Sequence, residues 1–227
     1  MKIRCSQIGK IMTNSRSKDS LSKTCKSYIQ EIVLEEKYGI KKEFWSRYTD
    51  KGNLVEQESI SLADEVLNWQ LPFVAEGYQQ YFENDYICGH TDVNTENILA
   101  DVKSSWSADT FPFFETTIEK NYMWQLMGYM WLTGHKKANL TYCLINTPEE
   151  MVLDEIRREH WKQNSFWNGD EDDEIVSYIR SKHNFDHIPK EKRVKNYIIE
   201  YDENLIKDLK DRIEQCRIYY NQIKSII

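Results

Sequence analysis

The chain has 227 residues, with 30 basic and 37 acidic side chains and a net charge of −7. Its length, its 40% hydrophobic content and its few glycines and prolines predict one globular domain over residues 1–227 and exclude long disordered linkers. No apolar run approaches the roughly 18 residues of a membrane span. Met1–Arg4 does not begin a signal peptide, so we expect a cytoplasmic protein with no membrane partner. The scattered cysteines show no Cys-x-x-Cys spacing, which argues against zinc or iron–sulfur ligation.

The spacing of apolar residues predicts helices at both ends of the chain and strands between them. A first helix begins after Ser20 or Ser22 and ends at Gly39, and a second follows Gly52. The later elements, in order, are a meander of strands at 78–82, 86–91 and 98–104, a helix at 119–133, strands at 138–146 and 193–201, and a helix capped by Asp202. This order indicates an α/β fold in which helices flank one mixed sheet.

Three charged side chains in the predicted meander carry the most chemical information. Asp92 is followed nine residues later by Asp101-Val102-Lys103. Residues two apart on a strand share a face, so the Asp101 carboxylate and the Lys103 ammonium point the same way. A turn at residues 94–97 would fold Asp92 back beside them. Two carboxylates and an ammonium at one point are the groups that hold a divalent cation and place water against a phosphate, which indicates a metal-dependent nuclease.

Two further polar residues are candidates because of the helices that carry them. Gln125 is the amide in the otherwise apolar helix 122–132, and a buried amide needs hydrogen-bond partners. It bonds either to a backbone carbonyl or to the charged site, with Tyr129 one turn below. Glu56 lies near the start of the second predicted helix, where Gly52 would let the helix approach a neighbouring strand closely.

An aromatic segment follows the strand that carries Lys103. It contains Trp106 and Phe111-Pro112-Phe113-Phe114. A loop of this kind either stacks on DNA bases or packs as a lid on the core, and the sequence leaves both readings open. The acidic balance of the whole chain counts against a wholly basic DNA-binding surface, while a local basic groove remains compatible with it.

Taken in order, Gly52-x-x-x-Glu56, Asp92, Asp101-x-Lys103 and Gln125-x-x-x-Tyr129 resemble the PD-(D/E)xK nuclease superfamily. Within it the chain resembles the branch of the phage lambda exonuclease and the YqaJ-type viral recombinases. Two other segments match that family in kind, namely its opening Thr-Ala-Ser segment at residues 4–13 and its late helix at Tyr122-Met123-x-Gln125. Thr91 stands where the family usually has proline, and Asp101 where glutamate is commoner.

The resemblance implies a restriction-endonuclease-like core and a role for each matched residue. Asp92, Asp101 and the Val102 carbonyl would bind Mg²⁺, or Mn²⁺ in its place, with Glu56 serving a second ion. Lys103 would stabilise charge on the scissile phosphate, and Gln125 would orient Lys103 or the attacking water. The residues expected to contact DNA are Ser6, Arg16, Ser104, Trp106 and Tyr129. A basic residue that the family places near the 5′-phosphate has no match, and Arg16 or Lys18 is the candidate substitute.

The function that the resemblance implies is an exonuclease that digests linear double-stranded DNA from 5′ to 3′ and leaves 3′ single strands. Those strands would serve phage-type recombination, in the host cytoplasm, through a single-strand annealing protein as partner. The resemblance also implies a homotrimer. The alternatives are an endonuclease or repair nuclease of the same fold, and a catalytically silent DNA-binding module. The intact acids, together with Lys103 and Gln125, argue against the silent module.

Overall fold

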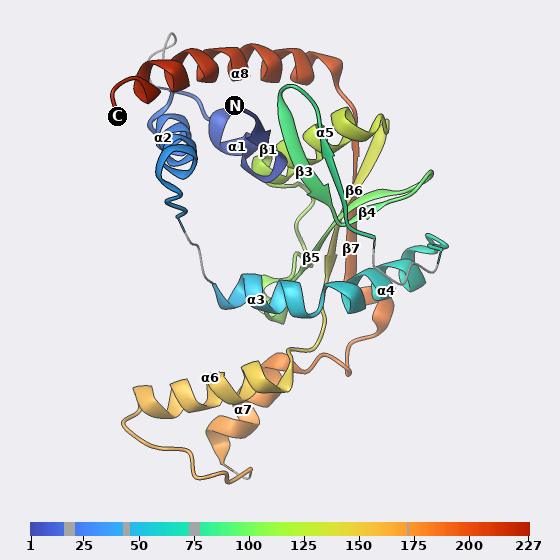
Figure 1. Ribbon diagram of the computed structural model, residues 1–227. Helices are drawn as coiled ribbons and strands as arrows, with labels where there is room; N and C mark the ends of the chain where they lie inside the picture. The colour runs from blue at the N-terminus through green and yellow to red at the C-terminus, as the bar shows by residue number, and fades with distance from the viewer. Residues whose placement is uncertain (16–20, 43–45, 73–77, 172) are drawn as a thin grey trace.

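The computed structural model describes residues 1–15, 21–42, 46–72, 78–171 and 173–227 (Figure 1). Its helices are α1 (Ile8–Ile11), α2 (Lys23–Tyr38), α3 (Arg47–Leu54), α4 (Glu56–Leu67), α5 (Lys120–Thr133), α6 (Glu149–Lys162), α7 (Glu174–His183) and α8 (Glu203–Lys224). Its strands are β1 (Ile3–Arg4), β2 (Gln80–Glu83), β3 (Ile87–Thr91), β4 (Val93–Asn94), β5 (Leu99–Ser104), β6 (Lys137–Cys143) and β7 (Val194–Glu200). Short 3-10 turns lie at Cys5–Gln7, Ala108–Thr110 and Lys190–Lys192.

The ends of the long helices lie where the sequence predicts them. The Ser22 hydroxyl accepts a hydrogen bond from the Cys25 amide at 3.0 Å, and Gly39 ends α2 in the left-handed region at φ 68°. The Asp202 carboxylate accepts from the Asn204 amide at 2.8 Å and so begins α8. These contacts satisfy backbone groups that a helix leaves unpaired at its ends. The helix predicted to follow Gly52 is α4, which begins at Glu56, whereas the shorter helix α3 that contains Gly52 was not predicted.

The strands form two hydrogen-bonded sheets, which corrects the predicted single mixed sheet. One sheet has the order β1-β3-β2 and the other has the order β4-β5-β6-β7. The first two strands of the predicted meander do pair antiparallel, whereas the third lies in the second sheet beside β6, to which it is parallel. The division arises at Asp92, where the chain bends between β3 and β4 and passes from one sheet to the other.

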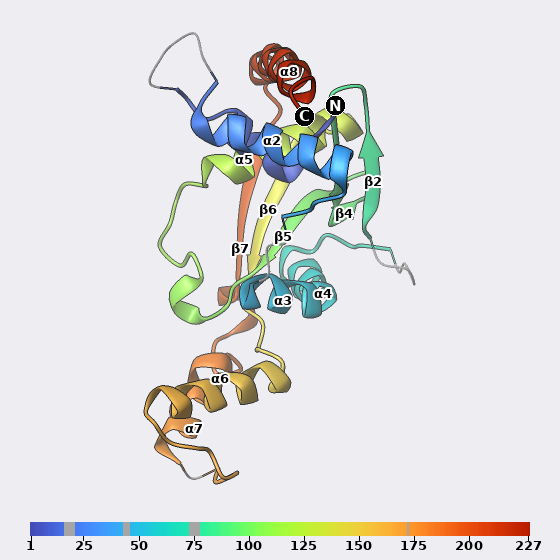
Figure 2. The same ribbon diagram turned by 60° about the vertical axis from the view of Figure 1, so that its left-hand side comes forward.

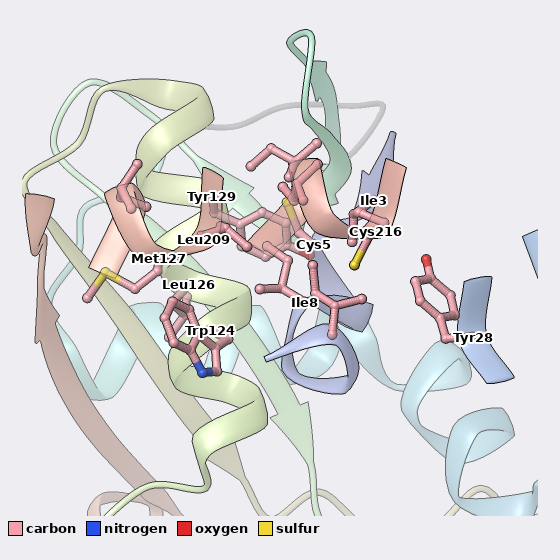
Figure 3. Close-up of a cluster of buried hydrophobic side chains, with 14 of the residues drawn as sticks. Ile3, Cys5, Ile8, Tyr28, Trp124, Leu126, Met127, Tyr129, Leu209 and Cys216 are labelled. Carbon is pink, nitrogen blue, oxygen red and sulfur yellow. The ribbon is translucent and has the colours of Figure 1, made fainter. Parts of the chain in front are cut away.

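The main core surrounds α5, whose residues from Trp124 to Met130 are all buried. Figure 3 shows side chains of α5 beside those of the N-terminal segment and α8, including Cys5, Ile8 and Leu209. Helix α8 lies across one end of the molecule with α2 next to it (Figure 1). The helix that carries Gln125 is therefore held on several sides, which fixes the place of that side chain.

Helices α6 and α7 form a separate lobe at the opposite end of the molecule, as Figures 1 and 2 show. They pack on each other through a small apolar cluster of their own, made of Val152, Ile156, Val176 and Ile179. The sequence analysis did not predict this pair of helices. None of the described helices is both long and apolar enough to cross a membrane.

Replacing Gly128 with alanine is expected to lower the free energy of unfolding, although alanine favours a helix by about 1 kcal/mol over glycine. A Cβ atom there would lie 2.6 Å from Ile8 Cδ1 and 2.9 Å from Cys5 Sγ. Overpacking of this kind costs about 1–3 kcal/mol. The control is Gly52→Ala, because a Cβ on Gly52 in α3 meets nothing within 4 Å. Thermal denaturation should show a lower Tm for Gly128→Ala and an equal or higher Tm for Gly52→Ala; equal Tm values would contradict the close contact.

Candidate active site

Asp92 lies at the bend between β3 and β4, and it turns its carboxylate toward β5. Its Oδ2 accepts a hydrogen bond from the Val102 amide at 2.7 Å. The intervening turn is closed by the Thr95 amide, which donates to the Ile98 carbonyl at 2.8 Å. The predicted return of Asp92 to the side of the Asp101–Lys103 strand is therefore confirmed.

Asp101 and Lys103 share one face of β5, as the alternation along a strand predicts. The Lys103 Nζ lies 2.7 Å from Asp101 Oδ2. Asp101 is only 1% exposed, whereas the Lys103 side chain keeps 30% of its surface open to solvent. A buried carboxylate thus pairs with the ammonium of a side chain that is partly exposed.

Gln125 is the second side-chain partner of Asp101, after Lys103. Its Nε2 donates to Asp101 Oδ1 at 2.7 Å and to the Tyr129 hydroxyl at 2.9 Å. The alternative, in which a backbone carbonyl satisfies this amide, is wrong. Gln125 and Tyr129 lie one turn apart on the same face of α5. Gln125 contacts β5 of the second sheet, whereas the Tyr129 ring lies beside Gly89 of β3 in the first sheet. Gln125 therefore contacts Asp101 directly, and Asp101 in turn contacts Lys103.

The charges of the site shift one another's pKa values. Burial, and then the nearby Asp101 carboxylate, raise the pKa of Asp92 to about 7. Burial alone would lower the pKa of Lys103, but the carboxylates of Asp101 and Asp92 outweigh it and raise that pKa above its usual value. Lys103 therefore stays protonated at neutral pH, and the site gathers negative charge that a cation would relieve.

The donor set fits a small divalent cation at the two aspartates. Oδ2 of Asp101 is buried. Among the described residues its one polar partner is the Lys103 ammonium, 2.7 Å away, so it has room for a further ligand. Mg²⁺ is commonly held by one or two protein carboxylates, with water and phosphate oxygens completing its shell. Asp92 and Asp101 supply those carboxylates, and the Val102 carbonyl remains the third predicted ligand.

Glu56 does not complete a three-carboxylate cluster. Among the residues described by the structure, no three His, Cys, Asp or Glu side chains are grouped to hold a metal ion. The Glu56 oxygens accept from Gln79 Nε2 at 2.8 and 3.0 Å, although its charge still contributes to the raised pKa of Asp92. The predicted close approach at Gly52 is wrong, since no atom of the described residues lies within 4 Å of a Cβ placed there.

The residues predicted to contact DNA differ in their exposure to solvent and in their hydrogen-bond partners. Ser6 is exposed, whereas the Ser104 hydroxyl lies 2.7 Å from that of Ser59 on α4. Tyr129 is only 4% exposed, so burial gives it a supporting role behind Gln125 in place of the predicted direct DNA contact. Arg16 and Lys18 lie outside the described residues.

The aromatic segment divides between the two roles left open by the sequence. Phe111 is buried against Leu144 and Phe185, as expected of a lid, whereas Phe114 is 92% exposed. Trp106 is partly buried, and its ring makes an edge contact with Tyr48 at 5.5 Å between centroids. The Trp106 DNA contact remains a prediction.

Two residues near the site were missed by the sequence analysis. The Lys103 ammonium lies over the Tyr122 ring, 5.6 Å from its centre. The three-residue spacing from Gln125 on one helix face was the signal available for Tyr122. Lys51 is fully buried beyond the end of β5, and no sequence signal marks a lysine for burial.

Comparison with known proteins was made by sequence and by structure. No family model and no curated protein matches the sequence. The phage-related exonuclease from Haemophilus somnus 129PT is a structural neighbour with a TM-score of 0.76 and 27% identity, over 99% of this chain and 96% of that one. The alkaline exonuclease LHK-Exo from Laribacter hongkongensis has a TM-score of 0.61 and 12% identity, over 99% of this chain and 90% of that one. Its complex with dAMP aligns with a TM-score of 0.58 at 13% identity, with the same coverage of both chains.

The fold, with its bent strand and its aspartate–lysine strand against a glutamine-bearing helix, is that of the PD-(D/E)xK superfamily. Within that superfamily the chain is similar in structure to a phage-related exonuclease and to an alkaline exonuclease, which are exonucleases of the lambda-exonuclease and YqaJ type. The resemblance drawn from the sequence motifs is confirmed at this level.

Proposed function

We propose that the chain is a DNA exonuclease that digests linear duplex DNA with the help of Mg²⁺. The observation that carries this proposal is the sharing of one buried carboxylate, Asp101, between Gln125 and Lys103, with Asp92 folded back beside them. The names of the structural neighbours support it, because both are exonucleases and one was solved with dAMP.

Each residue has a task that its surroundings favour. Asp92 and Asp101 would hold the ion with the Val102 carbonyl, and Glu56 would serve a second ion or its waters. When bound, such an ion supplies a Lewis acid for the phosphate and lowers the pKa of water. Lys103 presents a positive charge to a phosphoryl oxygen, because its pKa is raised by the two aspartates. Gln125 keeps Asp101 in the rotamer that faces both the ion site and Lys103.

The finer parts of the proposal are supported by the family resemblance. They are digestion from 5′ to 3′, Mn²⁺ as a substitute ion, a homotrimer, and a role in phage-type recombination with a single-strand annealing protein. The partial exposure of Lys103 supports access by a phosphate of an entering strand. Partly exposed Trp106 and exposed Ser6 are the candidate DNA contacts that the described surface leaves accessible.

The test is digestion of a 5′-phosphorylated linear duplex beside a closed circular plasmid, with Mg²⁺ or with chelator. We expect Mg²⁺-dependent loss of the linear DNA alone, with release of a label at the 5′ end before one at the 3′ end. Cutting of the circle would make the protein an endonuclease of the same fold. Binding of DNA with no cutting in Mg²⁺ or Mn²⁺ would make it a silent DNA-binding module.

A further inference from the structure

Lys51, on α3, is the lysine that the structure buries most deeply in its described part, with 0% of its surface exposed. Its Nζ donates to the carbonyl of Ser105 at 2.8 Å and to the carbonyl of Trp106 at 3.0 Å. The bonds join residues more than fifty positions apart in the chain. Neither Ser105 nor Trp106 belongs to a helix or strand. The Lys51 side chain therefore ties α3 to an irregular segment of the chain.

The surroundings of Lys51 are aromatic. The Nζ lies 5.4 Å from the centre of the Phe185 ring and 5.9 Å from that of Trp106. No carboxylate in the described ranges forms an ion pair with it, and burial lowers its pKa to about 7 against the opposing charge of Glu58. Burial of an unpaired lysine is unfavourable, so the two carbonyl bonds are the interactions that compensate for it.

The carbonyls that Lys51 holds lie directly beyond the strand of the active site. Ser105 follows the last residue of β5, the strand that carries Asp101 and Lys103. Strand β4 pairs with β5 at Leu99 and Ala100, so among the described strands β6 is the one neighbour of the second half of β5. An open edge allows the end of a strand to move unless other contacts fix it.

Contacts from three elements fix this end of the strand. The Ser105 amide donates to the Cys143 carbonyl of β6 at 2.9 Å, and the Ser104 and Ser59 hydroxyls lie 2.7 Å apart. Lys51 adds the next two bonds along the chain. We propose that Lys51 is a positioning residue that anchors the end of β5 and so sets the place of Lys103 relative to Asp101 and the scissile phosphate. This inference rests on the proposed nuclease function.

The test is Lys51→Met, which keeps the length and apolar stem of the side chain but removes its donors. We expect kcat on linear duplex DNA to fall about tenfold to a hundredfold, since small displacements of catalytic groups have effects of that size. The KM for DNA should stay within about twofold, because Lys51 does not reach the surface. A general loss of stability would not produce that split in a fully folded sample.

Ile156→Ala is the matched control, because it removes a buried side chain from the α6–α7 cluster, far along the chain from β5. Both variants are assayed at a temperature where circular dichroism shows them folded, and Ile156→Ala should keep the wild-type kcat. Hydrogen–deuterium exchange of peptides covering residues 101–106 gives a second readout that needs no activity. Exchange there should be at least tenfold faster in Lys51→Met than in the other two proteins.

The outcomes separate this inference from the proposed function. Wild-type kcat in folded Lys51→Met, or unchanged exchange at residues 101–106, would overturn the positioning role while leaving a nuclease. Absence of cutting by the wild-type protein would overturn the nuclease proposal and this role in it, whatever the exchange shows about the strand.

Discussion

Lys103→Ala is expected to lower turnover on linear duplex DNA by about a hundredfold to a thousandfold, as removal of one group that stabilises transition-state charge commonly does. The ammonium lies 2.7 Å from Asp101 Oδ2, and the Lys103 side chain is partly open to solvent, so we expect it to meet a phosphate. DNA binding should persist, because a single charge on the strand is a small part of a phosphate-tracking surface. Steady-state digestion and a mobility-shift assay in chelator measure the two effects.

The control for Lys103→Ala is Lys136→Ala. Lys136 is exposed and also lies over a tyrosine ring, 4.6 Å from the centre of Tyr201, but it touches neither aspartate. It removes the same charge and the same kind of aromatic contact, and turnover should be preserved. Unchanged turnover in Lys103→Ala would remove this lysine from the mechanism.

Asp101→Asn is expected to abolish both ion binding and turnover. The two carboxylate oxygens each face a donor, Gln125 Nε2 on one side and Lys103 Nζ on the other. An asparagine must turn its own NH₂ toward one of these donors, and it lacks the charge that a hard cation requires. We expect at least a thousandfold loss of turnover, which corresponds to about 4 kcal/mol in the barrier.

Thermal denaturation tests Asp101→Asn without any reaction. Mg²⁺ at about a hundred times its dissociation constant should stabilise the wild-type protein by roughly 2.7 kcal/mol and raise its Tm. Asp101→Asn should show no such rise, whereas the exposed control Asp109→Asn should behave as the wild type does. A Tm rise of wild-type size in Asp101→Asn would place the ion elsewhere.

Local signals in the sequence were enough to predict the elements that carry the site. Strand alternation placed Asp101 and Lys103 on one face, and the cap at Ser22 and the stop at Gly39 located α2. The apolar helix with one amide singled out Gln125 and left two partners open, a backbone carbonyl or the charged site, of which the structure shows the second. Each of these signals depends on residues a few positions apart, which is the range over which backbone periodicity acts.

The features that the sequence analysis missed depend on tertiary contacts. The division into two sheets follows from the bend at Asp92, and nothing local distinguishes a bent strand from a straight one there. Burial of Lys51 depends on carbonyls that lie more than fifty residues away. The same is true of the hydrogen bond from Gln79 to Glu56 and of the burial of Tyr129. Both depend on neighbours that only the completed fold brings together.

Because the chain bends at Asp92, the site is built from residues of both sheets. The first aspartate lies where the chain leaves the β1-β3-β2 sheet, and its partners stand on β5 in the other sheet and on the helix packed between. If one sheet has formed and the other has not, the chain contains all of these side chains, but they are not brought together into a site. We therefore expect cutting to require that both sheets are formed, so that a partly folded chain does not cut the DNA around it.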